Sequence, residues 1–218
     1  MRSCKKLFII LITSLMLLGC SSKPLGLIED EVEFVISRVN KSKPHENQNH
    51  NKGFFSYYLP LNVGVLRANK ISTVLLIDGS EVFMGLNVSE VLSNKIENNQ
   101  VNQDDFVLVK NFSTDNNENK TVANQLIIEQ LDLDQYLIYL KVNEVFFVSS
   151  LPRAAISSTL ENMLIISRTI DVDKRMVVAE FSNKEEMNYQ QQVIELFSES
   201  VPEEGFLKEI YANDKEDD

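Results

Sequence analysis

Cysteine is scarce in this chain of 218 residues, which contains only Cys4 and Cys20. Both lie within the first 20 residues, so the rest of the chain has no thiol. This absence excludes a disulfide framework, a thiol nucleophile and a cysteine-ligated metal site from the body of the protein. The folded part must therefore be stabilised by a hydrophobic core, and an apolar fraction of 44% is typical of globular proteins that have one.

Glycine and tryptophan are also scarce. The seven glycines, at positions 19, 26, 53, 64, 79, 85 and 205, are too widely spaced for a phosphate-binding loop, and no G-x-S-x-G motif is present. The sequence therefore predicts no catalytic residues and no cofactor, and we expect a protein that is not an enzyme. A hydrolase that uses paired carboxylates remains open, because such pairs need no sequence motif. The absence of tryptophan disfavours a cleft in which sugars stack.

Basic residues are outnumbered by acidic ones, 21 to 32, and the formal net charge is −11. Proteins that neutralise phosphates need clustered Lys and Arg, so nucleic acid is not an expected partner. Acidic residues accumulate after position 198, and residues 214–218 form an acidic tail. Such a run predicts a solvated terminus; contact with a cation or a basic partner is the alternative.

Residues that could bind metal do not form a recognisable set. The only histidines, His45 and His50, are five residues apart in a polar segment, 41–53, that predicts a mobile loop. On a helix this spacing would place them on different faces, unlike the H-E-x-x-H motif of zinc hydrolases. The pairs Asp132/Asp134 and Asp171/Asp173 lack the rest of a calcium-binding loop and are expected in turns or helix caps. The sequence predicts no metal site, with a weak surface site at the histidines as the alternative.

The N-terminal segment combines three basic residues, Arg2, Lys5 and Lys6, with an apolar run at residues 7–18. A helix of about 12 residues is roughly 18 Å long, whereas a bilayer has about 30 Å of hydrocarbon to cross. This pattern is typical of a secretory signal peptide. A buried N-terminal helix or an uncleaved anchor is the alternative.

The segment Leu17-Leu18-Gly19-Cys20 resembles the lipobox of bacterial lipoproteins. The resemblance implies that residues 1–19 are a cleaved signal peptide and that Cys20 carries a lipid, with residues 20–26 as a short tether. It also implies an extracytoplasmic protein, held by lipid at the outer face of the cell membrane, or in the outer membrane if the cell has one. Loss of the three N-terminal basic residues takes the formal charge from −11 to −14. An anionic leaflet repels such a domain, so we expect attachment through the lipid alone.

Helices and strands are predicted along the rest of the chain from apolar periodicity. A helix is expected at 27–40, with a buried stripe of Ile28, Val32, Val35, Ile36 and Val39. Asn87 is expected to cap a short helix at 88–96. Turns are expected at Asp78-Gly79-Ser80 and at Asn143-Glu144. Strands are expected at 54–58, 62–68, 72–78, 81–86, 106–112, 122–131, 136–142 and 144–150.

A longer helix is predicted at 152–170, with Ser150 as its cap and Pro152 in its first turn. Its buried stripe is expected to be Ile156, Leu160, Met163 and Leu164, and its solvent face Ser157, Ser158, Glu161, Asn162 and Arg168. Beyond it, a turn at 171–174, a strand at 175–181, a helix at 184–197 and a strand or short helix at 205–212 are expected.

The predicted fold is α+β, with a mainly antiparallel sheet and about four helices packed on it. A single domain is expected over residues 27–213. The function that these observations favour is that of a non-enzymatic, lipid-anchored binding or assembly module of the cell envelope. Its expected partners are the membrane, through the lipid on Cys20, and other envelope proteins. The alternatives are a small-molecule-binding accessory of a transport system and the carboxylate-based hydrolase.

Overall fold

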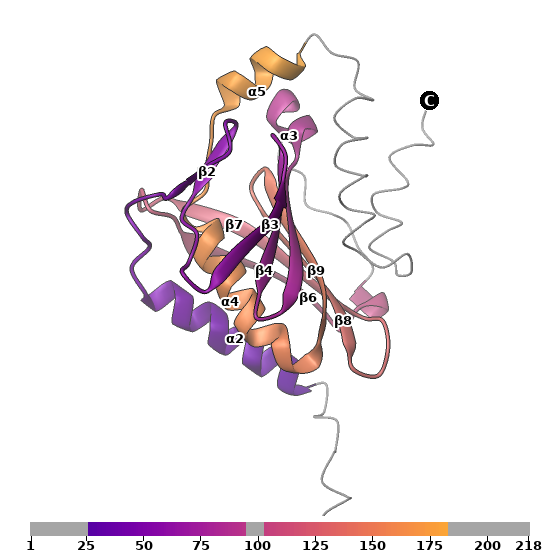
Figure 1. Cartoon of the computed structure of the whole chain (residues 1–218). Coiled ribbons are helices and arrows are strands. Elements are labelled where there is room, and N and C mark those ends of the chain that lie inside the picture. The colour runs from indigo at the N-terminus through magenta and orange to yellow at the C-terminus, as the bar shows by residue number, and fades with distance from the viewer. Residues whose placement is uncertain (1–25, 95–102, 183–218) are drawn as a thin grey trace, which may run out of the picture.

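The computed structural model describes residues 26–94 and 103–182, and over these ranges the chain folds as α+β (Figure 1). Four α-helices and ten strands occur in the described ranges. The predicted signal peptide, Cys20, the helix at 184–197, the element at 205–212 and the acidic tail lie outside the described residues.

Seven antiparallel strands form the main sheet, in the spatial order β3-β4-β5-β9-β8-β7-β6. Their bounds, in chain order, are β3 Val63–Ala68, β4 Ser72–Ile77, β5 Ser80–Leu86, β6 Leu108–Asp115, β7 Thr121–Gln130, β8 Gln135–Val142 and β9 Val145–Pro152. A smaller antiparallel sheet has the order β1-β2-β10 and consists of β1 His50–Asn51, β2 Phe55–Tyr57 and β10 Asp171–Val172.

Tight turns set the register of the main sheet. Asp78 and Gly79 both have positive φ, 49° and 83°, as a two-residue hairpin loop requires, and β4 and β5 pair directly on either side of them. Asn143 has φ 49° in the turn between β8 and β9. Both predicted hairpins are confirmed. The strand predicted at 122–131 is β7.

Helices α2, Gly26–Lys41, and α4, Ile156–Ser167, pack against each other and against one face of the main sheet (Figure 1). The predicted apolar stripes of both helices are buried, which confirms those assignments. They join apolar side chains of β4, β5, β7, β8 and β9 in one core cluster. The opposite face of the sheet carries a second buried cluster, formed by Val74, Phe83, Ile127, Leu137, Tyr139, Phe146 and Val148.

The predicted start of the second long helix was wrong. Ser150 and Pro152 belong to β9, which remains paired with β8 as far as Gln135 opposite Pro152. A 3-10 turn, Arg153–Ala155, then leads into α4 at Ile156. Pro152 is the last residue of β9, so the N–H donor that it lacks is missing only at the end of the strand, and strand pairing prevails over the local signal for a helix start.

The predicted strand at 175–181 was also wrong, because this segment is part of helix α5, Lys174–Phe181. Asp173 caps it by accepting a hydrogen bond from the backbone N–H of Met176, at 3.0 Å. Val177 and Phe181, one helical turn apart, are buried, whereas Met176 and Val178 are exposed. The run of β-branched residues therefore follows helical rather than alternating burial.

Two residues expected on the solvent face of the second long helix are buried, Asn162 and Arg168. Asn162 donates to the carbonyl of Ser158, and Arg168 donates to carbonyls of α2 and β6. The short helix α3, Val88–Ser93, is capped by Asn87 as predicted and ends at Asn94. Segment 41–53 is mostly irregular, but it ends in β1, which pairs with β2.

Candidate functional site

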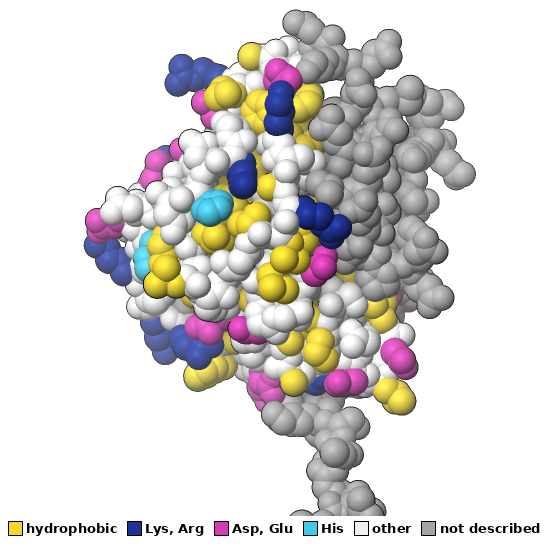
Figure 2. All heavy atoms as spheres, in the orientation of Figure 1, with side chains coloured by type: hydrophobic (Ala, Val, Ile, Leu, Met, Phe, Trp, Pro, Cys, Tyr) yellow, Lys and Arg dark blue, Asp and Glu magenta, His cyan; other side chains and the backbone are white. Residues whose placement is uncertain are grey.

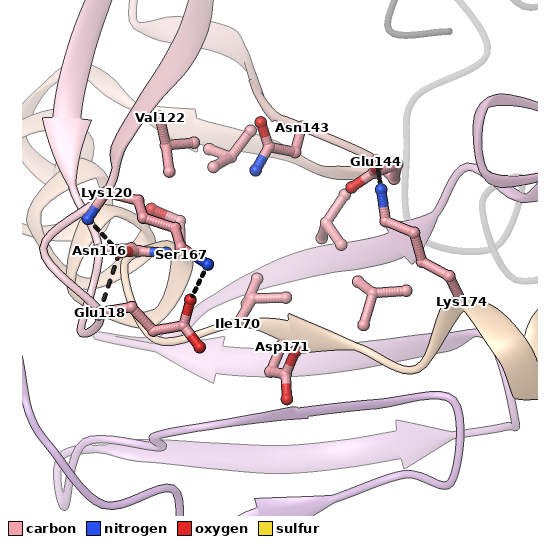
Figure 3. Close-up of a pocket in the computed structure, with 13 residues that line it drawn as sticks. Asn116, Glu118, Lys120, Val122, Asn143, Glu144, Ser167, Ile170, Asp171 and Lys174 are labelled. Atoms are coloured by element: carbon pink, nitrogen blue, oxygen red, sulfur yellow. Dashed lines mark hydrogen bonds and ion pairs between the residues drawn. The ribbon is translucent and has the colours of Figure 1, made fainter. Parts of the chain in front are cut away.

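A pocket of about 290 Å³ opens where two hairpins of the main sheet meet the segment between α4 and α5 (Figure 3). Residues from the β6–β7 hairpin line one side, and residues from the β8–β9 hairpin line the other. The third side comes from the C-terminal end of α4, from β10 and from the start of α5. Residues far apart in the sequence therefore meet at this site.

The β6–β7 turn is held by Asn116, whose side-chain oxygen accepts hydrogen bonds from the backbone N–H groups of Glu118 and Lys120, at 3.0 and 2.8 Å. Asparagine favours such turns because its side chain reaches its own backbone a few residues on. The backbone N–H of Asn117 donates to the carbonyl of Arg168, at 3.0 Å, and so joins the turn to the end of α4. These bonds fix the positions from which Glu118 and Lys120 face the pocket.

Lys120 and Glu118 form an ion pair of 2.5 Å on the rim of the pocket. Their hydrogen bond and mutual attraction raise the pKa of the Lys120 ammonium, and the charge of Asp171 adds a smaller contribution in the same direction. Both side chains are largely exposed, so the pair contributes little to stability. A charged ligand can therefore replace either partner of this ion pair.

A second ion pair, between Lys174 and Glu144, lies on the other side of the pocket (Figure 3). Glu144 belongs to the β8–β9 turn, and its side chain is 7% exposed, whereas that of Lys174 is 50% exposed. The backbone carbonyl of Glu144 accepts a hydrogen bond from the N–H of Asn87, at 2.7 Å, which fixes the turn against the cap of α3. The pocket therefore combines an anchored carboxylate with a lysine that reaches it from α5.

Five further lining residues are apolar, Val122, Val142, Val145, Ile170 and Val172, and three are polar, Asn116, Asn143 and Ser167. A mixed surface with both signs of charge suits a small ligand that itself carries a cationic and an anionic group. The carboxylates of the pocket are Glu118, Glu144 and Asp171, and the first two are each held by a lysine. These carboxylates and lysines can bind a charged ligand through ion pairs.

The histidines do not meet at this pocket. His45 stacks on Tyr58, with ring centroids 3.7 Å apart, and His50 lies in β1 against Tyr57. Asp132 is in the β7–β8 turn, where its carboxylate accepts the N–H of Leu133, and Asp173 caps α5. These placements confirm the prediction of a turn or a cap for Asp132 and Asp173. The prediction was wrong for Asp171, which lies in strand β10 and pairs with Ser56 of β2. No cluster of three or more His, Cys, Asp or Glu side chains is placed to hold a metal ion within 26–94 and 103–182.

Sequence analysis predicted no site at the four paired residues of this pocket, Glu118, Lys120, Glu144 and Lys174, and named Glu144 only as a turn residue. All four lie in turns or at a helix start, where charged residues are expected to face solvent, and none belongs to a motif. The partner of the buried Glu144, Lys174, begins α5, most of which was predicted as a strand. Over the described part of the chain, no helix has the length and apolar character that crossing a membrane requires.

Comparison with known proteins identifies no family for this chain. No protein-family model matches it, and no curated protein matches it. A crystal structure from Bacteroides thetaiotaomicron VPI-5482 is similar over 73% of this chain and 73% of its own, with 10% sequence identity and a TM-score of 0.27. A likeness at this level carries no argument about fold or function.

Proposed function

We propose that this protein is a lipid-anchored binding module of the cell envelope. The observation that carries the proposal is the sequence Leu17-Leu18-Gly19-Cys20, at the end of a basic and then apolar N-terminal segment. Acylation of Cys20 and cleavage before it would leave only residues 20–25 ahead of α2, which begins at Gly26. Six extended residues span at most about 20 Å, so the domain would be held close to the membrane surface.

The domain supports this role by providing a stable body on a short tether. Helices α2 and α4 and the main sheet share one core cluster, so the first helix after the tether is part of the core itself. Because α2 is buried along one side against α4 and the sheet, its apolar stripe is not available to lie on the membrane. The lipid is then the means of attachment, and the domain is free to bind a partner protein of the envelope.

Binding of a small molecule is a second candidate function, and the pocket beside Glu144 favours it. A ligand with an amine and a carboxylate could engage Glu144 or Glu118 through its amine, and Lys120 or Lys174 through its carboxylate. This role is compatible with a transport accessory that is held at the membrane by lipid. It predicts that Lys174→Ala and Lys120→Ala each weaken binding of such a ligand without unfolding the domain.

The lipid anchor is tested by metabolic labelling of the full-length protein with radioactive palmitate in its own cells. The wild-type protein should incorporate the label, and its N-terminal peptide should have the mass of a diacylglycerol-modified cysteine. Cys20→Ala should abolish labelling. Cys4→Ala is the matched control, because it removes the other cysteine from a segment that the proposal has cleaved away, and it should leave labelling unchanged.

Equal labelling of the wild type and Cys20→Ala would contradict the proposal. So would a mature protein whose N-terminal peptide begins before residue 20. Circular dichroism of purified Cys20→Ala should match that of the wild type, because the described domain begins only at Gly26.

A further inference from the structure

A second pocket, of about 210 Å³, lies where α2 and α4 end, and it is separate from the pocket beside Glu144. Its polar lining consists of Arg38, Ser42, Lys43, His45, Glu161 and Arg168. In Figure 2, dark blue side chains gather at the lower left, where Figure 1 places the C-terminal end of α2. The pocket is thus a cationic feature on a protein whose net charge is −11.

Arg168 lines this pocket and is 4% exposed. Its Nε donates to the carbonyl of Asp115 at 2.6 Å, and its Nη1 donates to the carbonyls of Val39 and Ser42 at 2.5 and 3.0 Å. Two of these acceptors are carbonyls at the end of α2, where a cation is favoured by the helix dipole. Burial lowers the pKa of the Arg168 guanidinium, although the nearby charge of Asp115 opposes this effect.

The third nitrogen of this guanidinium, Nη2, has no hydrogen-bond acceptor among the residues that the structure describes. Every acceptor bonded to Nε and Nη1 is neutral: three backbone carbonyls and the hydroxyl of Ser42. A buried charge is costly unless an opposite charge or hydrogen bonds balance it. Arg168 therefore keeps the N–H donors of one nitrogen, and no carboxylate is hydrogen-bonded to its positive charge.

Two further cations line the same pocket. Arg38 forms an ion pair of 2.5 Å with Glu161, and Lys43 forms one of 2.5 Å with Glu46. The side chains of Lys43 and Glu46 are 80% and 69% exposed, so solvent weakens their attraction and Lys43 can turn to another anion. With Glu161 as its one lining carboxylate, the pocket has a formal charge of +2.

We propose that this pocket binds a small oxyanion of the phosphate class. Arg168, held by its bonds to α2 and β6, supplies a fixed guanidinium, and Arg38 and Lys43 supply two more exposed cations. Guanidinium groups suit this ligand because their fork of N–H donors matches the geometry of phosphate oxygens. The inference depends on residues of α2, of α4 and of the loop that follows α2. It does not depend on acylation of Cys20.

The proposal is tested with the full-length protein in a phosphate-free maltoside detergent, titrated with inorganic phosphate and followed by phosphorus NMR. Chloride replaces phosphate at constant ionic strength, so that screening alone produces no change. Saturable binding is expected in the wild type. Lys43→Gln should weaken it roughly threefold to fivefold, the effect of losing one exposed charge contact.

Glu161→Gln is the more discriminating variant, because it should strengthen phosphate binding by a similar factor. The change removes the one lining carboxylate and releases Arg38 from its ion pair. A variant that was merely damaged would bind phosphate less well. Lys70→Gln is the charge-matched control, since Lys70 is exposed, pairs with Glu180 and does not line the pocket; its affinity should equal that of the wild type.

Three results would overturn the proposal: non-saturable binding in the wild type, equal affinities for Lys43→Gln and Lys70→Gln, or no gain from Glu161→Gln. Arg168 is left unsubstituted because its other bonds hold the end of α2. Circular dichroism establishes that each variant is folded before its affinity is compared.

Discussion

At the scale of single residues, α4 contains a matched pair of positions for testing which face is buried. Leu160 is fully buried in the core, whereas Ser158 is partly exposed and its hydroxyl donates only to the carbonyl of Ala155, at 3.3 Å. Leu160→Ala should lower the free energy of unfolding by roughly 2–5 kcal/mol, through lost burial and a residual cavity. Ser158→Ala should change it by less than about 0.5 kcal/mol. Urea unfolding measures both, and equal effects would contradict this assignment of faces.

Gly85 tests packing on the other face of the sheet. A Cβ built at this position would approach ring atoms of Phe83 and Phe146 to 2.8 Å, and both rings are buried. Gly85→Ala should therefore lower the free energy of unfolding by roughly 1–3 kcal/mol, the usual cost of overpacking. Gly64→Ala is the control, because its Cβ would meet only the Cβ of Leu76, at 3.6 Å. Thermal unfolding should show Gly64→Ala at or above the wild-type melting temperature; two equal losses would contradict the packing argument.

Apolar burial in the helices was predictable from the sequence, but buried polar residues were not. The stripes of α2 and α4 follow from helical spacing alone, and they are buried as expected. Asn162 and Arg168 were both predicted on the solvent face because they are polar. Asn162 instead bonds within α4, to the carbonyl of Ser158. Arg168 bonds to Asp115 and Val39, which come from other elements. The buried ion pair between Lys141 of β8 and Glu90 of α3 could not be predicted for the same reason, because its partners are 51 positions apart in the sequence.

At the scale of elements, hairpins were predicted better than helix boundaries. Turn residues such as Asp78-Gly79 and Asn143 carry a local conformational requirement, so their positions could be inferred from the sequence. The start of α4 and the secondary structure of α5 depend instead on contacts that compete with the local sequence preference. β9 is paired with β8 through Pro152, and residues 174–181 form a helix that Asp173 caps and that buries Val177 and Phe181.

The role of that cap is itself testable. Asp173 accepts a hydrogen bond from the N–H of Met176, so Asp173→Ala should destabilise α5 by about 1 kcal/mol. Hydrogen exchange of the α5 amides reports this loss locally. Asp171→Ala removes the same charge two residues earlier, from exposed β10, and should leave exchange in α5 near the wild-type rate. Equal acceleration in both variants would mean that charge, and not capping, stabilises the helix.

At the scale of the whole molecule, the α+β class was predictable, but the two pockets were not. Alternation of strands, turns and helices defines the class, and the described structure confirms it. Each pocket, by contrast, joins segments more than 50 residues apart: the β6–β7 turn with the start of α5, and the end of α2 with the end of α4. Such contacts depend on the order of strands in the sheet, which the sequence pattern does not contain.

The stability of the whole domain should not depend on a bound metal ion. His45 is stacked on Tyr58, His50 lies in β1, and within 26–94 and 103–182 no three metal-ligating side chains cluster. Because a bound ion stabilises a fold through its affinity for the native state, EDTA should leave the melting temperature unchanged. For a domain of this size, about 1 kcal/mol corresponds to roughly 2–4 °C, so differential scanning calorimetry can detect a contribution of that order. A drop of several degrees in EDTA, reversed by zinc or calcium, would contradict the prediction. His45→Ala together with His50→Ala would then show whether the loop supplies the ligands.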